Sequence, residues 1–163
     1  MNIVIRVFDE TGHIGYLGFN DNGPYITSLA KAYEYDDAEG AQYDAQRFAM
    51  EHFGVYNTCP VVEEAYLRYQ AVVGALDGWD IVSHGAADPS GRYGVMAKKA
   101  HLAVNFYASL EYESFEIYDQ ADDGLPEQGI GYDTADGDTP FTPEVLVSII
   151  ARCCLAYLEN WRT

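Results

Sequence analysis

Residues 142–161 read TPEVLVSIIARCCLAYLENW and carry the strongest structural signal in the chain. Thr142 is suited to cap a helix, Pro143 to its first position, and Glu144 to the positive end of the helix dipole. The apolar residues that follow occupy more than one side of the helical repeat. We therefore predict a C-terminal helix with more than one buried face, which runs through the centre of the fold and packs on a sheet.

The first 35 residues have the pattern of short β-strands. Apolar side chains alternate over residues 2–8, and turn-forming residues dominate 9–12 and 20–24. Three or four strands are therefore expected, the last of them near 32–35, joined as a small antiparallel meander.

The middle of the chain predicts helices and a few additional strands. Apolar residues spaced by three and four predict helices over 37–53 and 60–76. Short strands are expected at 79–82 and 111–118. The segment 95–110 fits either a helix or a strand, and we favour the helix.

Length and composition suit one α+β domain. The chain has 163 residues, of which 48% are hydrophobic and 14% aromatic, so enough apolar material exists for a core. We expect a single domain over residues 1–163. It should contain a small N-terminal antiparallel sheet and three or four helices, with the C-terminal helix packed on the sheet.

Charge limits the classes of partner. The chain has nine Lys and Arg residues against 26 Asp and Glu residues, a formal net charge of -17. Phosphate contacts need basic residues and anionic membranes repel acid, so direct binding to nucleic acid or to a membrane is not expected. The three Cys residues lack zinc-site spacing and predict reduced thiols in a cytoplasm. We expect neither a metal nor another cofactor.

Many of the Asp and Glu residues lie in one region of the chain. From Ala100 to Ala151 there is no Lys or Arg, but there are eleven carboxylates. They alternate with aromatic residues over 111–118 and continue through 119–141, which reads as a long acidic loop. Such carboxylates can imitate the phosphates of a nucleic acid, and aromatic residues can anchor an interface. The candidate partner-binding residues are Glu111, Tyr112, Glu113, Phe115, Glu116, Tyr118, Asp119, Asp122, Asp123, Glu127, Asp133, Asp136 and Asp138.

Other interpretations of these residues stay open. The acid can serve solubility alone. Residues 119–130 match three EF-hand positions but lack the bidentate acid at position twelve, so at most a weak cation site is predicted. His84, Asp88 and Arg92 lie in a loop rich in Gly, Pro and Ser, which a small α+β enzyme could use, although no nucleophile elbow accompanies them.

Three features together resemble a class of known proteins. They are the acidic segment from Glu111 to Glu144, the C-terminal PFTPEVLVSIIARCCLAYL, and the N-terminal IVIRVFDETGHIGYLGF, which leads through PYITSLAKAYEYDDAEGAQYDAQRF into a helix. At this level the chain is similar to small acidic antirestriction and anti-defence proteins of phages and plasmids. That class implies an inhibitor that occupies the nucleic-acid site, or another basic surface, of a host defence complex.

The favoured hypothesis is therefore a non-enzymatic, acidic inhibitor in the cytoplasm of a host cell. It would bind the basic surface of a nucleic-acid-binding host complex and block a restriction or CRISPR-type nuclease as a DNA mimic. Two alternatives remain, a small α+β enzyme that uses the His84 loop and a structural or accessory phage protein. A homodimer is compatible with each of them.

Overall fold

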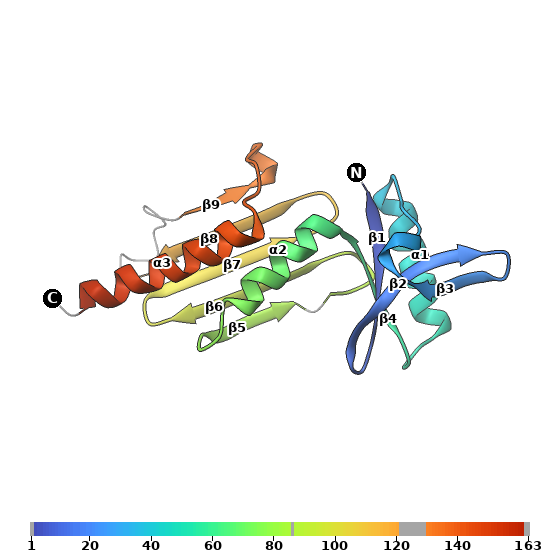
Figure 1. Cartoon of the computed structure of the whole chain (residues 1–163), viewed down its shortest axis with the longest axis horizontal. Helices are drawn as coiled ribbons and strands as arrows, with labels where there is room; N and C mark the ends of the chain where they lie inside the picture. The colour runs from blue at the N-terminus through green and yellow to red at the C-terminus, as the bar shows by residue number, and fades with distance from the viewer. Residues whose placement is uncertain (1, 86, 121–129, 162–163) are drawn as a thin grey trace. The chain divides into compact units, whose positions relative to one another are not determined.

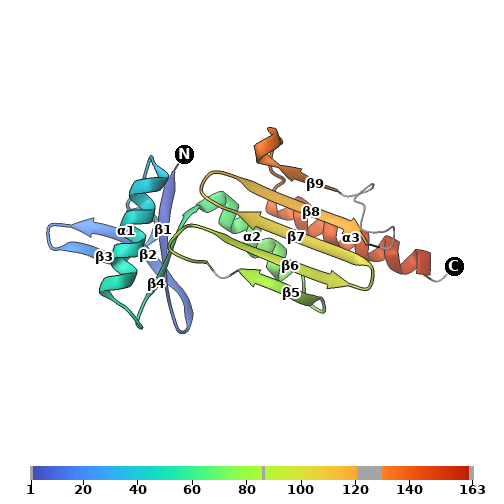
Figure 2. The ribbon, with the colours of Figure 1, turned by 180° about the vertical axis from the view of Figure 1, so that it is seen from behind.

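The computed structural model describes residues 2–85, 87–120 and 130–161 of the chain, with side chains up to residue 156 (Figures 1 and 2). The described residues form an α+β fold with two antiparallel sheets of four and five strands. Its contacts divide it into two compact units. The first unit comprises Met1–Ala65, Ala86–Tyr93 and Ser109–Glu111, and the second comprises Tyr66–Gly85, Gly94–Ala108 and Tyr112–Thr163. The single domain over 1–163 stays a prediction.

The first unit is a four-stranded sheet with the order β3-β2-β1-β4 and a helix, α1, packed against it. The central strand β1 directs Ile3, Ile5 and Val7 into a core shared with Ala45 and Phe48 of α1. The predicted meander and the helix near 37–53 are both confirmed. The elements are β1 (Ile3–Asp9), β2 (Gly12–Asn20), β3 (Gly23–Thr27), the 3-10 turn η1 (Leu29–Lys31), α1 (Ala38–Glu51) and β4 (Asn57–Val62).

Two predictions at the edges of this unit were wrong. The strand expected at 32–35 is reduced to one isolated bridge between Tyr35 and Ile3. Residues 57–62, of which 60–62 were predicted as the start of a helix, form β4 instead and pair with β1, with Pro60 opposite Ile5. The pairing partners in β1 lie 49 to 59 positions away in the sequence, so local spacing could not reveal them.

The second unit is a five-stranded sheet with the order β5-β6-β7-β8-β9. Figures 1 and 2 show α2 and α3 on the same face of this sheet, and Figure 2 shows the strands from the opposite side. The elements are α2 (Glu63–Gly74, which begins in the first unit), β5 (Asp80–Gly85), β6 (Tyr93–Lys99, whose Tyr93 belongs to the first unit), β7 (Leu102–Ala108), β8 (Glu113–Asp119), β9 (Ile130–Asp133), the 3-10 turn η2 (Thr134–Asp136) and α3 (Pro143–Trp161).

This five-stranded sheet corrects the expectation of one small N-terminal sheet. The largest error is segment 95–110, which forms most of the hairpin of β6 and β7 rather than a helix. Ala100 has a φ of 53°, a left-handed conformation that suits a tight hairpin turn and would interrupt a helix. Ala97, Ala100 and Ala103 repeat at a helical spacing, whereas Leu102, Val104 and Phe106 alternate as in a strand, so the periodicity was ambiguous. The strands expected near 79–82 and 111–118 are confirmed as β5 and β8.

The C-terminal helix α3 begins as predicted. The hydroxyl oxygen of Thr142 accepts a hydrogen bond from the backbone N–H of Val145 at 3.3 Å. Among the described side chains, Leu146, Ile149 and Ile150 are buried, whereas Val145, Val147 and Leu155 are exposed. The helix therefore lies on the sheet with one buried face and does not run through the centre of the fold. None of the helices in the described part of the chain is long and apolar enough to cross a membrane.

Candidate partner-binding face

The face of the five-stranded sheet opposite α2 and α3 carries polar side chains on β7, β8 and β9. Strands β7 and β8 alternate, so Phe106, Phe115 and Ile117 are buried, while Asn105 and Glu116 are partly exposed. Adjacent residues of a strand point to opposite sides of the sheet, which places this second set away from the helices. We call this side the open face. Its members on these strands and on β9 are Asn105, Tyr107, Ser114, Glu116, Tyr118 and Asp133.

A hollow of about 370 Å³ lies on the open face, over β8 and its two neighbouring strands β7 and β9. Glu116 is opposite Asn105 on one side and Gly131 on the other. A side chain at Gly131 would approach the backbone oxygen of Phe115 to 2.1 Å, so this position admits only glycine without a shift of the backbone. The polar side chains that line the hollow are Asn105, Ser114, Glu116, Asp133 and Asp138.

Local hydrogen bonds hold two of the carboxylates of the hollow in place. Asp133 caps η2 by accepting a hydrogen bond from the N–H of Ala135 at 2.8 Å. Asp138 accepts one from the N–H of Asp133 at 3.1 Å. Gly137 closes the turn with a φ of 87°. The negative charge therefore sits on a fixed loop and is already positioned before any partner arrives.

The chemistry of the hollow suits a cationic side chain. Its polar lining consists of carboxylates, an amide and a hydroxyl, and the chain has no Lys or Arg between residues 100 and 151. Within the described residues no group of His, Cys, Asp and Glu is arranged to hold a metal ion. Lys and Arg donate to carboxylates in strong, charge-assisted hydrogen bonds, so either residue of a partner protein fits this site.

Aromatic side chains extend the open face beside the hollow. The ring centroids of Tyr107 and Tyr112 are 5.3 Å apart, and the side chain of Tyr112 is exposed. Tyr118 follows Glu116 on the same side of β8 and is partly exposed. Tyrosine combines a large apolar area with a polar group, which makes it a frequent anchor of protein interfaces.

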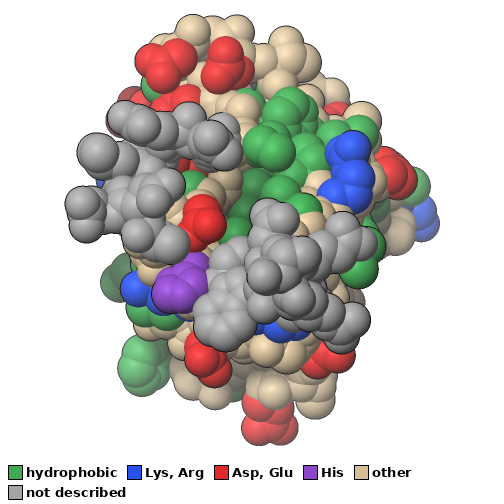
Figure 3. All heavy atoms as spheres, turned by 90° about the vertical axis from the view of Figure 1, so that its left-hand side faces the viewer, with side chains coloured by type: hydrophobic (Ala, Val, Ile, Leu, Met, Phe, Trp, Pro, Cys, Tyr) green, Lys and Arg blue, Asp and Glu red, His purple; other side chains and the backbone are tan. Residues whose placement is uncertain are grey.

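The thirteen predicted residues separate into three groups. Glu111, Tyr112, Asp119, Asp136 and Asp138 are exposed, and Glu116, Tyr118 and Asp133 are partly exposed. Figure 3 views the chain from the left-hand side of Figure 1 and shows Asp and Glu side chains on that surface together with hydrophobic, Lys, Arg and His side chains. The predictions for Asp122, Asp123 and Glu127 fall outside the described residues. Glu113 and Phe115 are buried.

Glu113 belongs to a buried ion cluster, so its predicted role as a partner contact stays a prediction that its burial does not favour. Arg68 of α2 donates two hydrogen bonds of 2.8 Å to its carboxylate, from Nε and from Nη2. The Tyr132 hydroxyl donates a third. Burial and this hydrogen bond to Glu113 raise the pKa of Tyr132 well above its usual range. Phe115 is part of the apolar interior, so both residues serve stability.

The structure adds Asn105, Ser114 and Tyr107 to the candidate site. All three were missed, two of them because segment 95–110 was predicted to be a helix. The signal that could have found Asn105 and Tyr107 is the alternation LAVNFYA at residues 102–108, in which polar or amphipathic residues occupy alternate positions near its end.

The residues of the alternative enzyme site have local structural contacts. His84 Nε2 and the Tyr69 hydroxyl share a hydrogen bond in the second unit. Asp88 belongs to the first unit, where it accepts hydrogen bonds from the backbone N–H and the hydroxyl of Ser90 and so stabilises a turn. These contacts give no support to a catalytic arrangement of His84, Asp88 and Arg92.

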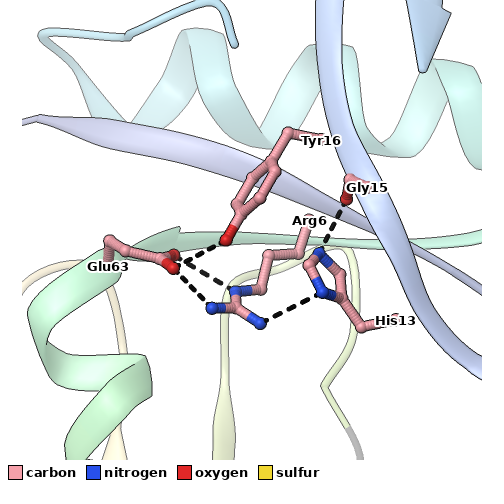
Figure 4. A network of polar contacts seen from close by, with 5 residues as sticks. All are labelled: Arg6, His13, Gly15, Tyr16 and Glu63. Atoms are coloured by element: carbon pink, nitrogen blue, oxygen red, sulfur yellow. Dashed lines mark hydrogen bonds and ion pairs between the residues drawn. The ribbon is translucent and has the colours of Figure 1, made fainter. Parts of the chain in front are cut away.

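A second buried ion cluster lies in the first unit (Figure 4). Arg6 on β1 is only 4% exposed and binds Glu63, with Nε at 3.1 Å from Oε2. The hydroxyl of Tyr16 donates to Glu63 at 2.7 Å. His13 accepts a 3.4 Å hydrogen bond from Arg6 through Nδ1 and donates from Nε2 to the carbonyl oxygen of Gly15 at 2.8 Å. The contact with Arg6, which can only donate, favours the neutral form of His13 with Nδ1 as the acceptor.

We expect this cluster to make the first unit less stable as the pH falls below about 7. Burial and the charge of Arg6 lower the pKa of His13 below its ordinary value of 6.5. The unfolded chain therefore binds a proton at His13 more readily than the folded chain, so the free energy of unfolding decreases with falling pH. Denaturant unfolding at pH 7.5, 6.5 and 5.5 should show a shallower pH dependence in His13→Gln than in the natural protein. Identical slopes would contradict the assigned role of His13.

The chain was compared with protein-family models, with curated proteins and with solved structures, and no match was found. The open face and its charges are therefore the basis of the functional proposal.

Proposed function

We propose that the protein is a non-enzymatic, acidic binding protein whose open face occupies a basic surface of a partner protein. The observation that supports this most is the hollow formed by Glu116, Asp133 and Asp138, which is bordered by tyrosines and lies in a chain segment without Lys or Arg. The specific form of the proposal is a DNA mimic that blocks a restriction or CRISPR-type nuclease of a host cell.

The magnitudes of surface interactions explain why such a face needs both acid and tyrosine. An exposed ion pair contributes only about 0.2–1 kcal/mol, so three carboxylates alone give weak binding. Their field acts chiefly on the association rate and on the choice of a basic partner. Tyr112, which is exposed, and Tyr118, which is partly exposed, add apolar contact area that can slow dissociation.

Competition with nucleic acid follows from this arrangement. A groove that binds DNA or RNA presents Lys and Arg side chains spaced to meet phosphates. Lys and Arg side chains that are bound to the carboxylates of this protein are not available to bind the phosphates of a nucleic acid. Inhibition should therefore be stoichiometric and should be relieved by excess nucleic acid.

Salt should weaken the complex strongly. For a nuclease that binds this protein, we expect the dissociation constant of the complex to rise roughly tenfold or more between 50 and 200 mM KCl, because added ions screen the charged contacts. The measurement is calorimetry or interferometry on a panel of purified restriction and CRISPR-type nucleases, paired with DNA-cleavage assays at each salt concentration. Binding that is unchanged across this range would contradict an electrostatic interface. Strong binding without inhibition of cleavage would contradict the DNA-mimic form.

A further inference from the structure

A cluster of apolar side chains is exposed in the first unit, where α1 turns into β4. Phe53 is 90% exposed, Met50 77% and Val55 59%. Single exposed apolar residues are common on protein surfaces, but three within six residues form a local patch of the kind that marks an interaction site. None of them belongs to the open face, which lies in the second unit.

The turn that carries these residues is held firmly. The backbone N–H groups of Val55 and Tyr56 both donate to the carbonyl oxygen of His52, at 2.9 and 3.1 Å. His52 Nδ1 donates to the carbonyl oxygen of Phe48 at 2.9 Å, and the rings of His52, Phe48 and Tyr56 all contact one another. Gly54 has a φ of 81°, a conformation that favours glycine. Phe53 is therefore held in the solvent by a defined turn.

A groove of about 390 Å³ lies beside this turn, within the first unit. Phe8 and Tyr56 give it an apolar lining, together with Phe53 and Val55. The volume falls within the usual range for binding pockets and can accept a large apolar side chain. The same groove is also lined by Asp9 and Glu10, from the turn between β1 and β2.

The acidic residues that line this groove, Asp9 and Glu10, favour a positively charged occupant. Asp9 accepts hydrogen bonds from the hydroxyl and the backbone N–H of Thr11, at 2.5 and 2.8 Å, and they lower its pKa below 3.8. Its carboxylate is therefore ionised at neutral pH, and the acidic side chain of Glu10 lies next to it. A Lys or Arg beside the groove would be attracted, whereas anionic lipid or a second acidic chain would be repelled.

We infer that this groove docks a segment of a partner protein in which a large apolar side chain stands next to a Lys or Arg. The apolar side chain enters the groove against Phe53 and Val55, and the basic group meets Asp9 and Glu10. This is a second contact surface, independent of the open face. It binds through apolar burial as well as charge, so it is less sensitive to salt.

The test uses a fluorescent probe peptide of alternating Leu and Lys residues, with two control peptides in which Ser replaces Leu or Glu replaces Lys. Phe53→Ser combined with Val55→Ser should weaken probe binding at 200 mM salt about tenfold or more. Matched substitutions at exposed residues elsewhere in the same unit, Leu29→Ser with Tyr43→Ser, should leave it unchanged. Both control peptides should bind more weakly than the probe. Circular dichroism of each variant verifies folding, which replacement of exposed side chains is expected to preserve.

Several outcomes would overturn the inference. Equal probe binding by the two paired variants would show that net charge alone attracts the peptide. Probe binding abolished by replacing Glu116, Asp133 and Asp138 would place the peptide on the open face instead. If the natural protein sediments as a dimer and the Phe53 variant as a monomer, the groove is covered by a second copy and not by a basic partner.

Discussion

Replacement of Glu113 by alanine is expected to lower the free energy of unfolding of the second unit by about 3–5 kcal/mol. Glu113 is 5% exposed, and its carboxylate is the acceptor for both Arg68 and Tyr132. Without it, the partly buried guanidinium of Arg68 has lost the negative charge that offsets its desolvation. This is a larger effect than that of most single substitutions, and denaturant unfolding measured by circular dichroism would detect it directly.

Two further variants show whether the charge or the packing is responsible. Combined replacement by Arg68→Met and Glu113→Leu removes both charges, so much of the lost stability should return. Glu51→Ala breaks an ion pair with Arg47 that is exposed on both sides, and it should leave stability nearly unchanged. A double variant as unstable as Glu113→Ala would contradict the role assigned to the ion pair.

The fold could be predicted where the signals are local. The cap at Thr142, the turns that follow β1 and β2, and the spacing of Ala41, Ala45 and Phe48 act within a few residues, so α3, the meander and α1 were identified. Strand β4 and the hairpin of β6 and β7 depend on distant partners and on a period that alanines leave ambiguous. The second half of β4 and most of the β6–β7 hairpin were therefore assigned to helices, and only two strands of the second sheet, near residues 79–82 and 111–118, were predicted.

The candidate site shows the same division. The alternation of acid with aromatic residues predicted β8 correctly, but it could not say which side of the strand faces solvent. Glu113 lies on the buried side because Arg68, 45 positions earlier in the chain, supplies its counter-charge. Glu116 lies on the other side, next to Asn105 across the ladder. Sequence therefore indicated the strand, and tertiary pairing decided which carboxylates are available to a partner.

The largest effect on binding is expected from the hollow itself. Combined replacement by Glu116→Gln, Asp133→Asn and Asp138→Asn should weaken binding to the partner nuclease by about 10- to 100-fold, the loss of several ion pairs together. Asn retains an oxygen that can cap η2, so the Asp133 substitution should preserve the turn. The substitutions should act chiefly on the association rate and should flatten the salt dependence.

A charge-matched control separates the hollow from the overall charge of the protein. Asp21, Glu34 and Asp36 are exposed in the first unit, and their replacement by Asn, Gln and Asn removes the same three charges with the same chemistry. The two triple variants have equal net charge and differ only in where the carboxylates were removed. Long-range attraction should be similar in both, whereas contact at the open face should differ.

The most direct measurement is the dissociation constant of the partner nuclease for these two triple variants, in the same buffer at 100 mM salt. The proposal predicts a loss of about 10- to 100-fold for the open-face variant and less than about threefold for the control. Equal losses for both variants, or unchanged binding for both, would contradict the claim that the open face of the five-stranded sheet is the binding site.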